Sequence, residues 1–185
     1  MGQYYRPILT NANGYERVYN RHVDGEYTMA KLMEHSWWKN PFVGSICKKI
    51  FKNPMQVVWV GDYSDDAEET NEIKKAELVR LHKKAWQGKG HGIKKNELFL
   101  DNLYLVNHTK KIYLDCNAYK EDCINDGWCI HPLPLLTAIG NGLGGGDYRE
   151  DDSWQVGMWA NDLISIEEEV PDGYLADDYI FREDW

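Results

Sequence analysis

The chain has 185 residues, of which 43% are hydrophobic and 28% are charged. This length fits one ordinary domain or two small ones, and the composition is close to that of globular proteins, which excludes wholesale disorder. No apolar run reaches the roughly 18–20 residues of a membrane-spanning helix, and four cysteines are too few for a disulfide scaffold. The N-terminus lacks the apolar core of a secretory signal, so we expect a cytoplasmic protein, in the host cytoplasm if a phage encodes it.

The first fifty residues predict a hairpin followed by two helical segments. Residues 3–9 and 15–20 are rich in β-prone side chains, and the Asn13-Gly14 pair between them suits a tight turn. Residues 30–35 and 41–51 have helical character, and apolar side chains recur every four residues in the second segment. The Asn-Pro pair that follows is expected to end this helix, because proline disfavours the helical conformation of the residue before it.

A buried strand, a long helix and a linker are predicted next. Residues 55–60 form a short, almost wholly apolar run, which is typical of a strand covered on both faces. Residues 68–86 carry acidic side chains early and basic ones late, which suits the helix dipole, and their apolar side chains fall on one stripe. Residues 87–96 contain three glycines and predict a mobile linker.

The order of elements then starts again. Residues 103–106 and 111–114 predict a second hairpin, residues 133–139 a short helix, and residues 154–159 and 163–166 two strands. Each half therefore reads hairpin, helix, strand. This repetition indicates a diverged tandem duplication, and the alternative is chance recurrence of a common order.

We therefore predict an α+β fold. It consists of two related hairpin-helix-strand halves, joined by a helix and a glycine- and lysine-rich linker and packed as one or more antiparallel sheets with helices. The expected boundaries are 1–66 for the N-terminal half, 67–97 for the connecting helix and linker, and 98–185 for the C-terminal half with its acidic tail.

Charge is distributed unevenly along the chain. The formal net charge is −9, yet residues 145–185 hold thirteen acidic and two basic residues, a balance of −11. Residues 74–95 hold eight basic residues and one acidic residue, a balance of +7. Such asymmetry bears on binding partners rather than on the fold.

The most unusual segment is glycine-rich, with five glycines among residues 140–146. Glycine lets the backbone approach a ligand closely, and free amides in such a loop can hold a phosphate. However, the sequence matches neither the phosphate-loop nor the dinucleotide fingerprint, and the acidic residues that follow would repel an anion. A structural loop is the alternative to a ligand site. The residues of the candidate ligand loop are Gly142, Gly144, Gly145, Gly146 and Asp147.

Other residue patterns point to structure more than to chemistry. Cys116, Cys123, Cys129 and His131 are all potential zinc ligands, but the spacing of the cysteines is too wide for a zinc site, so we expect free, partly buried thiols. The basic residues of 74–95 could bind nucleic acid directly, but we expect instead that they form the solvated face of an amphipathic helix. We predict no catalytic residue, no metal ligand, no cofactor and no membrane contact.

Several segments resemble a family of small bacterial and phage proteins to which no activity is assigned. They are residues 1–5 (Met-Gly-Gln-Tyr-Tyr), 31–35, 59–63, 140–148 and 156–160. In that family the glycine-rich segment lies between the Lys-Leu-Met-Glu patch and the strand ending in Gly-Asp-Tyr. Here these features are divided between the two halves of the chain. The resemblance implies a mobile-element setting and no particular reaction.

This setting leads to two functional hypotheses. The first is a non-enzymatic phage or mobile-element inhibitor that binds a bacterial defence protein such as a CRISPR nuclease, similar to anti-CRISPR proteins in size and acidity. Its acidic, aromatic-bearing surface would compete for a basic nucleic-acid channel. The second is a divalent-metal-dependent enzyme or a small-ligand or nucleotide binder, built on the glycine-rich acidic loop. The residues assigned to partner binding are Asp147, Glu150, Asp151, Asp152, Trp154, Glu167, Glu168 and Glu169.

Overall fold

In the described part of the chain, one mixed, mostly antiparallel sheet of ten strands organises the fold. The computed structural model describes residues 2–27, 31–66, 72–125, 129–149, 153–179 and 181. The strands are β1 (Tyr5–Thr10), β2 (Glu16–Val23), β3 (Glu26–Tyr27), β4 (Met55–Gly61), β5 (His91–Ile93), β6 (Tyr104–Asn107), β7 (Ile112–Asp115), β8 (Ala138–Ile139), β9 (Leu163–Glu167) and β10 (Leu175–Ala176). The helices are α1 (Pro41–Ile50), α2 (Glu72–His82), α3 (Cys116–Asn125) and α4 (Pro132–Leu136), with the short helical turns η1 (Ser64–Asp66), η2 (Lys83–Gln87) and η3 (Ser153–Gln155).

The strand order repeats the same arrangement on the two sides of the sheet. The order is β10-β7-β6-β9-β4-β1-β2-β3, with β5 beside β2 and β8 beside β4. In the first half, β1 pairs with β2 as a hairpin and with β4 on its other side, and β5 runs parallel to β2. In the second half, β6 pairs in the same way with β7 and β9, and β10 runs parallel to β7. The predicted α+β class with two related halves is therefore confirmed.

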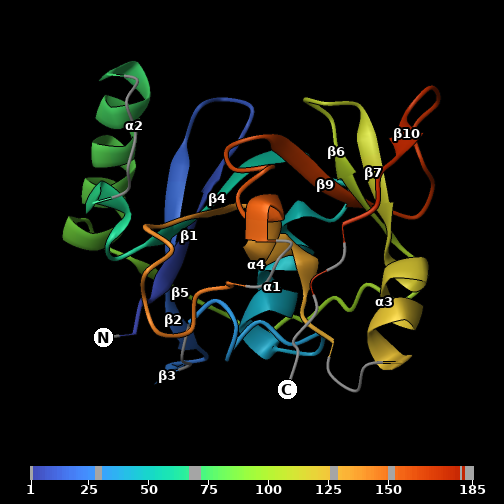
Figure 1. Ribbon diagram of the computed structural model, residues 1–185, viewed down its shortest axis with the longest axis horizontal. Coiled ribbons are helices and arrows are strands. Elements are labelled where there is room, and N and C mark those ends of the chain that lie inside the picture. Colours follow the sequence, from blue (N-terminus) through green and yellow to red (C-terminus); the bar gives the residue numbers. More distant parts are fainter. Residues whose placement is uncertain are drawn as a thin grey trace.

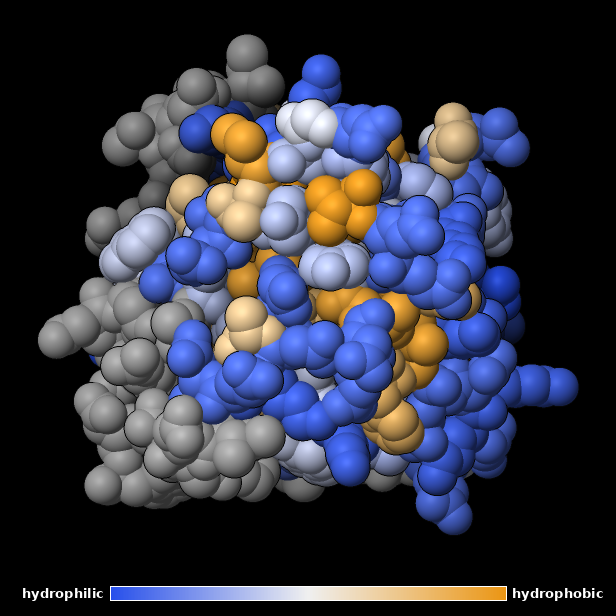
Figure 2. Space-filling view, turned by 90° about the vertical axis from the view of Figure 1, so that its right-hand side faces the viewer, coloured by the Kyte–Doolittle hydropathy of each residue, from blue (hydrophilic) through white to orange (hydrophobic). Residues whose placement is uncertain are grey.

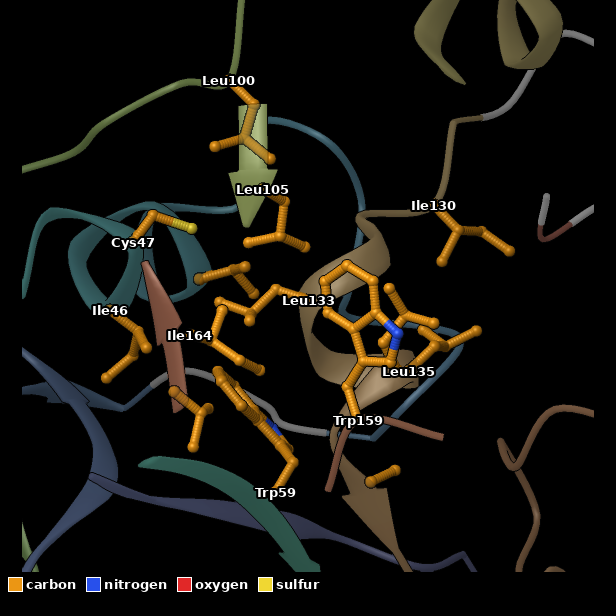
Figure 3. Close-up of a cluster of buried hydrophobic side chains, with 14 of the residues drawn as sticks. Ile46, Cys47, Trp59, Leu100, Leu105, Ile130, Leu133, Leu135, Trp159 and Ile164 are labelled. Carbon is orange, nitrogen blue, oxygen red and sulfur yellow. The ribbon is translucent and has the colours of Figure 1, made fainter. Parts of the chain in front are cut away.

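The two halves meet in the middle of one sheet and share one core. Strands β4 and β9 pair antiparallel through Met55 with Ile164 and Gln56 with Leu163. Figure 3 shows side chains from both halves, including Trp59 and Ile164, converging on a single cluster of buried side chains. The halves are thus joined by backbone hydrogen bonds and by apolar packing.

Strand β4 is covered on both faces, as its apolar run predicts. Val57 and Trp59 face the main core, which α1, α3 and α4 help to form. Val58 and Val60 face a smaller core, to which Leu81 of α2 also contributes. Figure 1 shows α2 at the left edge of the sheet, α1 and α4 near the centre and α3 at the right. The described part of the predicted 68–86 helix continues into a π-helical turn, η2, before Gly88.

Helix α1 begins where local chemistry favours it. The side chain of Asn40 accepts hydrogen bonds from the backbone nitrogens of Phe42 and Val43, which satisfies two of the free N–H groups at the helix start. Pro41 occupies the first turn, where its missing N–H costs nothing. The helix buries Phe42, Ile46 and Ile50 on one stripe, which confirms the predicted helix from residue 41.

Two predicted elements are wrong. Residues 32–35 form turns rather than a helix, and residues 28–30 lie outside the described part. Residues 153–160 form η3 and turns rather than a strand, with Gly157 at φ +78°. In both segments the backbone conformation is set by hydrogen bonds to residues far away in the sequence rather than by the local apolar pattern. The nitrogen of Met33 donates to the carbonyl oxygen of Gly146, and the nitrogen of Trp159 donates to that of Leu136.

Other segments are more ordered than the sequence indicates. Within the predicted linker, His91–Ile93 form β5 and Ile93 is buried. Helix α3 was not predicted, because its polar residues hide the buried Cys116, Tyr119 and Cys123 at helical spacing. The predicted helix over 133–139 is shorter, since α4 ends at Leu136 and β8 follows.

Candidate functional site

The glycine-rich loop packs against the beginning of β1. The backbone nitrogen of Gln3 donates to the carbonyl oxygen of Gly145 at 3.3 Å, and Gly2 and Gly145 form an isolated parallel β-bridge. A β-carbon at Gly144 would lie 2.8 Å from the nitrogen of Gln3, and one at Gly140 would collide with the side-chain amide of Gln3 and the hydroxyl of Tyr5. These two glycines are therefore required for the loop to approach β1 so closely.

A buried hydrogen-bond network lies beneath the loop. The hydroxyl of Tyr5 donates to Asp147 Oδ1 at 2.7 Å, and the nitrogen of Gly144 donates to Asp147 Oδ2 at 2.9 Å. A tyrosine hydroxyl has a single proton, and here it goes to Asp147. The amide of Gln3 must then turn its nitrogen toward both groups, 3.0 Å from the Tyr5 oxygen and 2.6 Å from Asp147 Oδ2. Its oxygen then accepts from the nitrogen of Tyr63 at 3.1 Å.

Burial controls the ionisation of this network. It raises the pKa of Asp147, and the nearby carboxylate of Asp62 raises it further, whereas the hydrogen bonds from Tyr5 and Gly144 and the charge of Arg149 lower it. Burial also raises the pKa of Tyr5, as does the charge of Asp147. The Tyr5 proton is therefore held firmly, and the pair acts as a fixed hydrogen bond rather than as an acid-base couple.

A cavity of about 510 Å³ opens beside this network. Its volume falls within the range of small-molecule sites. Asp147 is 8% exposed and contributes to the wall, as do Tyr5 and Arg149. The guanidinium of Arg149 donates to the carbonyl oxygen of Gly144 at 3.1 Å, which fixes it at the loop. The full lining is Tyr5, Leu32, Leu78, Ala138, Ile139, Gly140, Gly142, Asp147, Tyr148, Arg149, Ser153, Val156, Gly157 and Ala160.

Three backbone amides of the glycine-rich loop are engaged within the loop and are not free to hold a phosphate. The nitrogen of Leu143 donates to the side chain of Asn141, that of Gly144 to Asp147, and that of Asp147 to the carbonyl of Gly144. These amides are already engaged within the loop. Of the candidate ligand-loop residues, Gly142 and Asp147 line the cavity, whereas Gly144, Gly145 and Gly146 hold the loop against its neighbours.

The cation site of the second hypothesis rests partly on residues that lie outside the described part. Asp147 is described, and both of its oxygens already accept hydrogen bonds. Asp151 and Asp152 are not among the described residues. Within the described ranges, no group of three or more histidine, cysteine, aspartate or glutamate side chains is placed to hold a metal ion. The four cysteines are free; Cys47, Cys116 and Cys123 are buried.

The residues assigned to partner binding do not gather on one surface in the described part of the chain. Asp147 lies near the end of β4, because Tyr5 pairs with Gly61. Glu167 lies beyond the opposite end, because Ile164 pairs with Met55. The seven residues of β4 separate the two by about 20 Å.

Individually, these side chains have different surroundings. Glu167 accepts a hydrogen bond from Ser165 at 2.5 Å, and Glu168 forms an ion pair with Lys52 at 2.5 Å. Glu169 is exposed. Trp154 is 64% exposed, in η3 beside the cavity. Glu150, Asp151 and Asp152 lie outside the described residues.

Part of the acidic tail gathers elsewhere, at a smaller cavity of about 240 Å³ between β7, α3 and β10. Asp177 and Asp178 of the tail meet Asp115 and Asp122 there. Figure 2 views the molecule from this side and shows a mainly hydrophilic face interrupted by apolar patches. The Asp115 carboxylate is already used, because it accepts hydrogen bonds from two backbone nitrogens at the start of α3.

The sequence did not indicate that Gln3, Tyr5 or Arg149 belongs to the site. Tyr5 and Asp147 are 142 residues apart in the chain, and no local pattern links positions so distant. The single signal was the glycine-rich loop itself, which indicated a close backbone approach but not its partner.

Comparisons with known proteins add no family to these observations. No protein-family model, curated protein or solved structure matched the chain. In the described part of the chain, no helix is both long enough and apolar enough to cross a bilayer.

Proposed function

We propose that the protein binds a small polar molecule in the cavity beside the glycine-rich loop. The observation that carries this proposal is the placement of Asp147, a buried carboxyl group held in position by Tyr5 and Gly144, in the wall of a cavity of about 510 Å³. Polar groups fixed at defined positions in the wall of a concave pocket are typical of ligand sites.

The charges in the wall define the kind of ligand. Asp147 accepts hydrogen bonds, so it favours a ligand hydroxyl or amine group. Arg149 uses one of its donors on Gly144 and has others to offer, so it favours an anionic or carbonyl oxygen.

Nuclear magnetic resonance titration tests this proposal. Sugars, amino acids and nucleotides would be added to ¹⁵N-labelled protein, and the amide signals of Gly142 and Arg149 would be followed. We expect saturable shifts there with at least one class, and at least tenfold weaker binding in Arg149→Gln. The control is Lys89→Gln, at an exposed position that does not line the cavity. The proposal would be contradicted if the amide signals of Gly142 and Arg149 did not move with any ligand. It would also be contradicted if Arg149→Gln bound the ligand as tightly as the wild-type protein does.

A second proposal is that the protein binds and inhibits a bacterial defence nuclease. One observation favours a protein partner. Leu143, Trp154 and Met158 are 76%, 64% and 41% exposed, and their chain neighbours line the cavity. Exposed tryptophan near other apolar side chains is typical of binding hot spots. Among the described residues of the acidic set, Glu168 and Glu169 are exposed, whereas Asp147 is buried.

Capture of partners from a bacterial lysate tests the second proposal. A defence nuclease should be retained by the wild-type protein, and Trp154→Ala should release it. Replacing both Glu168 and Glu169 by lysine should weaken retention at low salt. Tyr15→Ala is the control, since Tyr15 is also exposed but lies in the β1–β2 turn. Retention that is indifferent to Trp154→Ala would refute this surface.

A further inference from the structure

A second cavity continues the first one along helix α2. It has a volume of about 350 Å³ and shares Leu78, Ile139 and Ala160 with the cavity beside the glycine-rich loop. Its remaining lining residues are Lys74, Glu77, Leu81 and Asn161. The two cavities therefore adjoin across these three shared side chains.

The chemistry of the wall changes from one end to the other. At the loop end the wall carries the Asp147 carboxyl, the Tyr5 hydroxyl and the Arg149 guanidinium. At the helix end it is formed mainly by aliphatic side chains, and the carboxylate of Glu77 is already bound by Arg80 at 2.7 Å. A polar compartment thus leads into an apolar one.

Three aliphatic side chains of the second cavity, those of Leu78, Ile139 and Ala160, are incompletely covered. Ile139 and Ala160 are partly buried and pack against the smaller core, to which Leu81 belongs. The cavity follows α2 from Lys74 to Leu81, a rise of about 10 Å. A flexible apolar chain lying there would remove further apolar surface from water, which is favourable.

We infer that the ligand of this site is an amphipathic molecule, with a polar head group beside Asp147 and a single alkyl chain along α2. This inference rests on the proposed function and adds the chemical class of the ligand. The head group hydrogen-bonds to Asp147 and Arg149, and the chain packs against Leu78, Ile139 and Ala160.

A homologous series of probes tests the inference. Butane-, hexane-, octane- and decane-1,2-diol present the same head group with chains of increasing length. The dissociation constant of each would be measured from amide shifts in ¹⁵N-labelled protein. Each methylene that enters the apolar cavity should tighten binding about fourfold. The longer diols should shift the amide signals of Leu81 and Ile139, whereas butane-1,2-diol should shift mainly those of the glycine-rich loop.

Variants locate the effect. Leu78→Gln should reduce the gain in affinity per methylene, because it places an amide group against the alkyl chain. Leu175→Gln is the matched control, since Leu175 is 70% exposed on β10 and should retain the wild-type gain. If Leu78→Gln does not fold, the positions of the shifted amides in the wild-type protein decide the question.

The outcomes separate the inference from the proposed function. Loop shifts with affinity independent of chain length would overturn the inference and retain the polar binding site. Chain-length dependence with shifts centred on Leu175 rather than Ile139 would overturn it as well. No loop shifts with any diol, together with none from the polar panel described above, would overturn both.

Discussion

The hydroxyl of Tyr5 and the carboxyl group of Asp147 form a buried 2.7 Å hydrogen bond between residues at opposite ends of the chain. This bond ties the first strand to the glycine-rich loop and places a carboxyl group in the cavity wall. The bond holds the loop so close to β1 that Gly140 and Gly144 pack directly against Gln3, which leaves no room for a side chain at either position.

Replacing Tyr5 by phenylalanine tests the strength of this bond. The variant leaves Asp147 and the Gln3 amide buried without the hydroxyl, which should lower the free energy of unfolding by about 1–3 kcal/mol. Urea denaturation measures the change. Tyr15→Phe removes a hydroxyl from an exposed side chain, and its effect should stay within about 0.5 kcal/mol. Equal effects of the two variants would show that the buried bond contributes nothing specific.

Adding a methyl group at Gly144 should disrupt the approach of the loop to β1. The new β-carbon would lie 2.8 Å from the nitrogen of Gln3, and such overpacking costs about 1–3 kcal/mol, occasionally more. Gly92→Ala is the matched control, because a β-carbon there would meet the carbonyl oxygen of His22 at an ordinary 3.5 Å. Thermal unfolding compares the two variants. A wild-type melting temperature for Gly144→Ala would contradict the close packing.

His131 should make stability depend on pH. Its Nδ1 accepts from the nitrogen of Leu133 at 3.2 Å, so the ring proton lies on Nε2, 3.4 Å from the Cys47 sulfur. Burial lowers the pKa of His131 to about 3, against about 6.5 in the unfolded chain. The unfolded chain therefore binds the proton first as the pH falls. The stabilisation is complete above about pH 6.5 and is lost progressively toward about pH 3.

The measurement is the free energy of unfolding at several pH values. The wild-type protein should lose up to about 1.4 kcal/mol per pH unit through His131 within this window. His131→Asn keeps an acceptor for the nitrogen of Leu133 and should lose this part of the slope. His91→Asn, on β5, should retain it. A slope unchanged in His131→Asn would mean that His131 titrates alike in the folded and unfolded states.

The junction between the two halves predicts cooperative unfolding. Ile164 is fully buried where β9 meets β4, so Ile164→Ala should cost about 2–5 kcal/mol. Because both halves share the core, circular dichroism and tryptophan fluorescence should report one coincident transition in the variant as in the wild-type protein. Leu175→Ala, at an exposed position, should change little. Separate transitions for the two probes would instead indicate halves that unfold independently.

Much of the fold could be predicted from local patterns. β-Prone side chains and an Asn-Gly turn predicted the β1–β2 hairpin, and the apolar run at 55–60 predicted a strand covered on both faces. The repeated order of elements predicted the two related halves. Local patterns failed where tertiary contacts decide the backbone, as at Met33 and Trp159, and where too few apolar residues mark an element, as in β5.

The candidate site was predictable only in part. The glycine-rich loop and Asp147 could be identified from composition, because five glycines in seven residues require a packing or binding explanation. Tyr5 could not, because its contact with Asp147 depends on how β1 and β4 are placed in the sheet. In the described part of the chain, the acidic residues that cluster in sequence do not share one surface, since β4 separates Asp147 from Glu167.

The two-residue contact between β4 and β9 makes the chain divisible at a defined point. Asp101 and Asn102 form an exposed turn immediately before the second repeat begins at β6. A break there would separate β1–β5 from β6–β10, and it would leave β4 without its neighbours β8 and β9. We expect the two fragments to reassemble on mixing, because the shared core and the Tyr5–Asp147 bond form only when both are present.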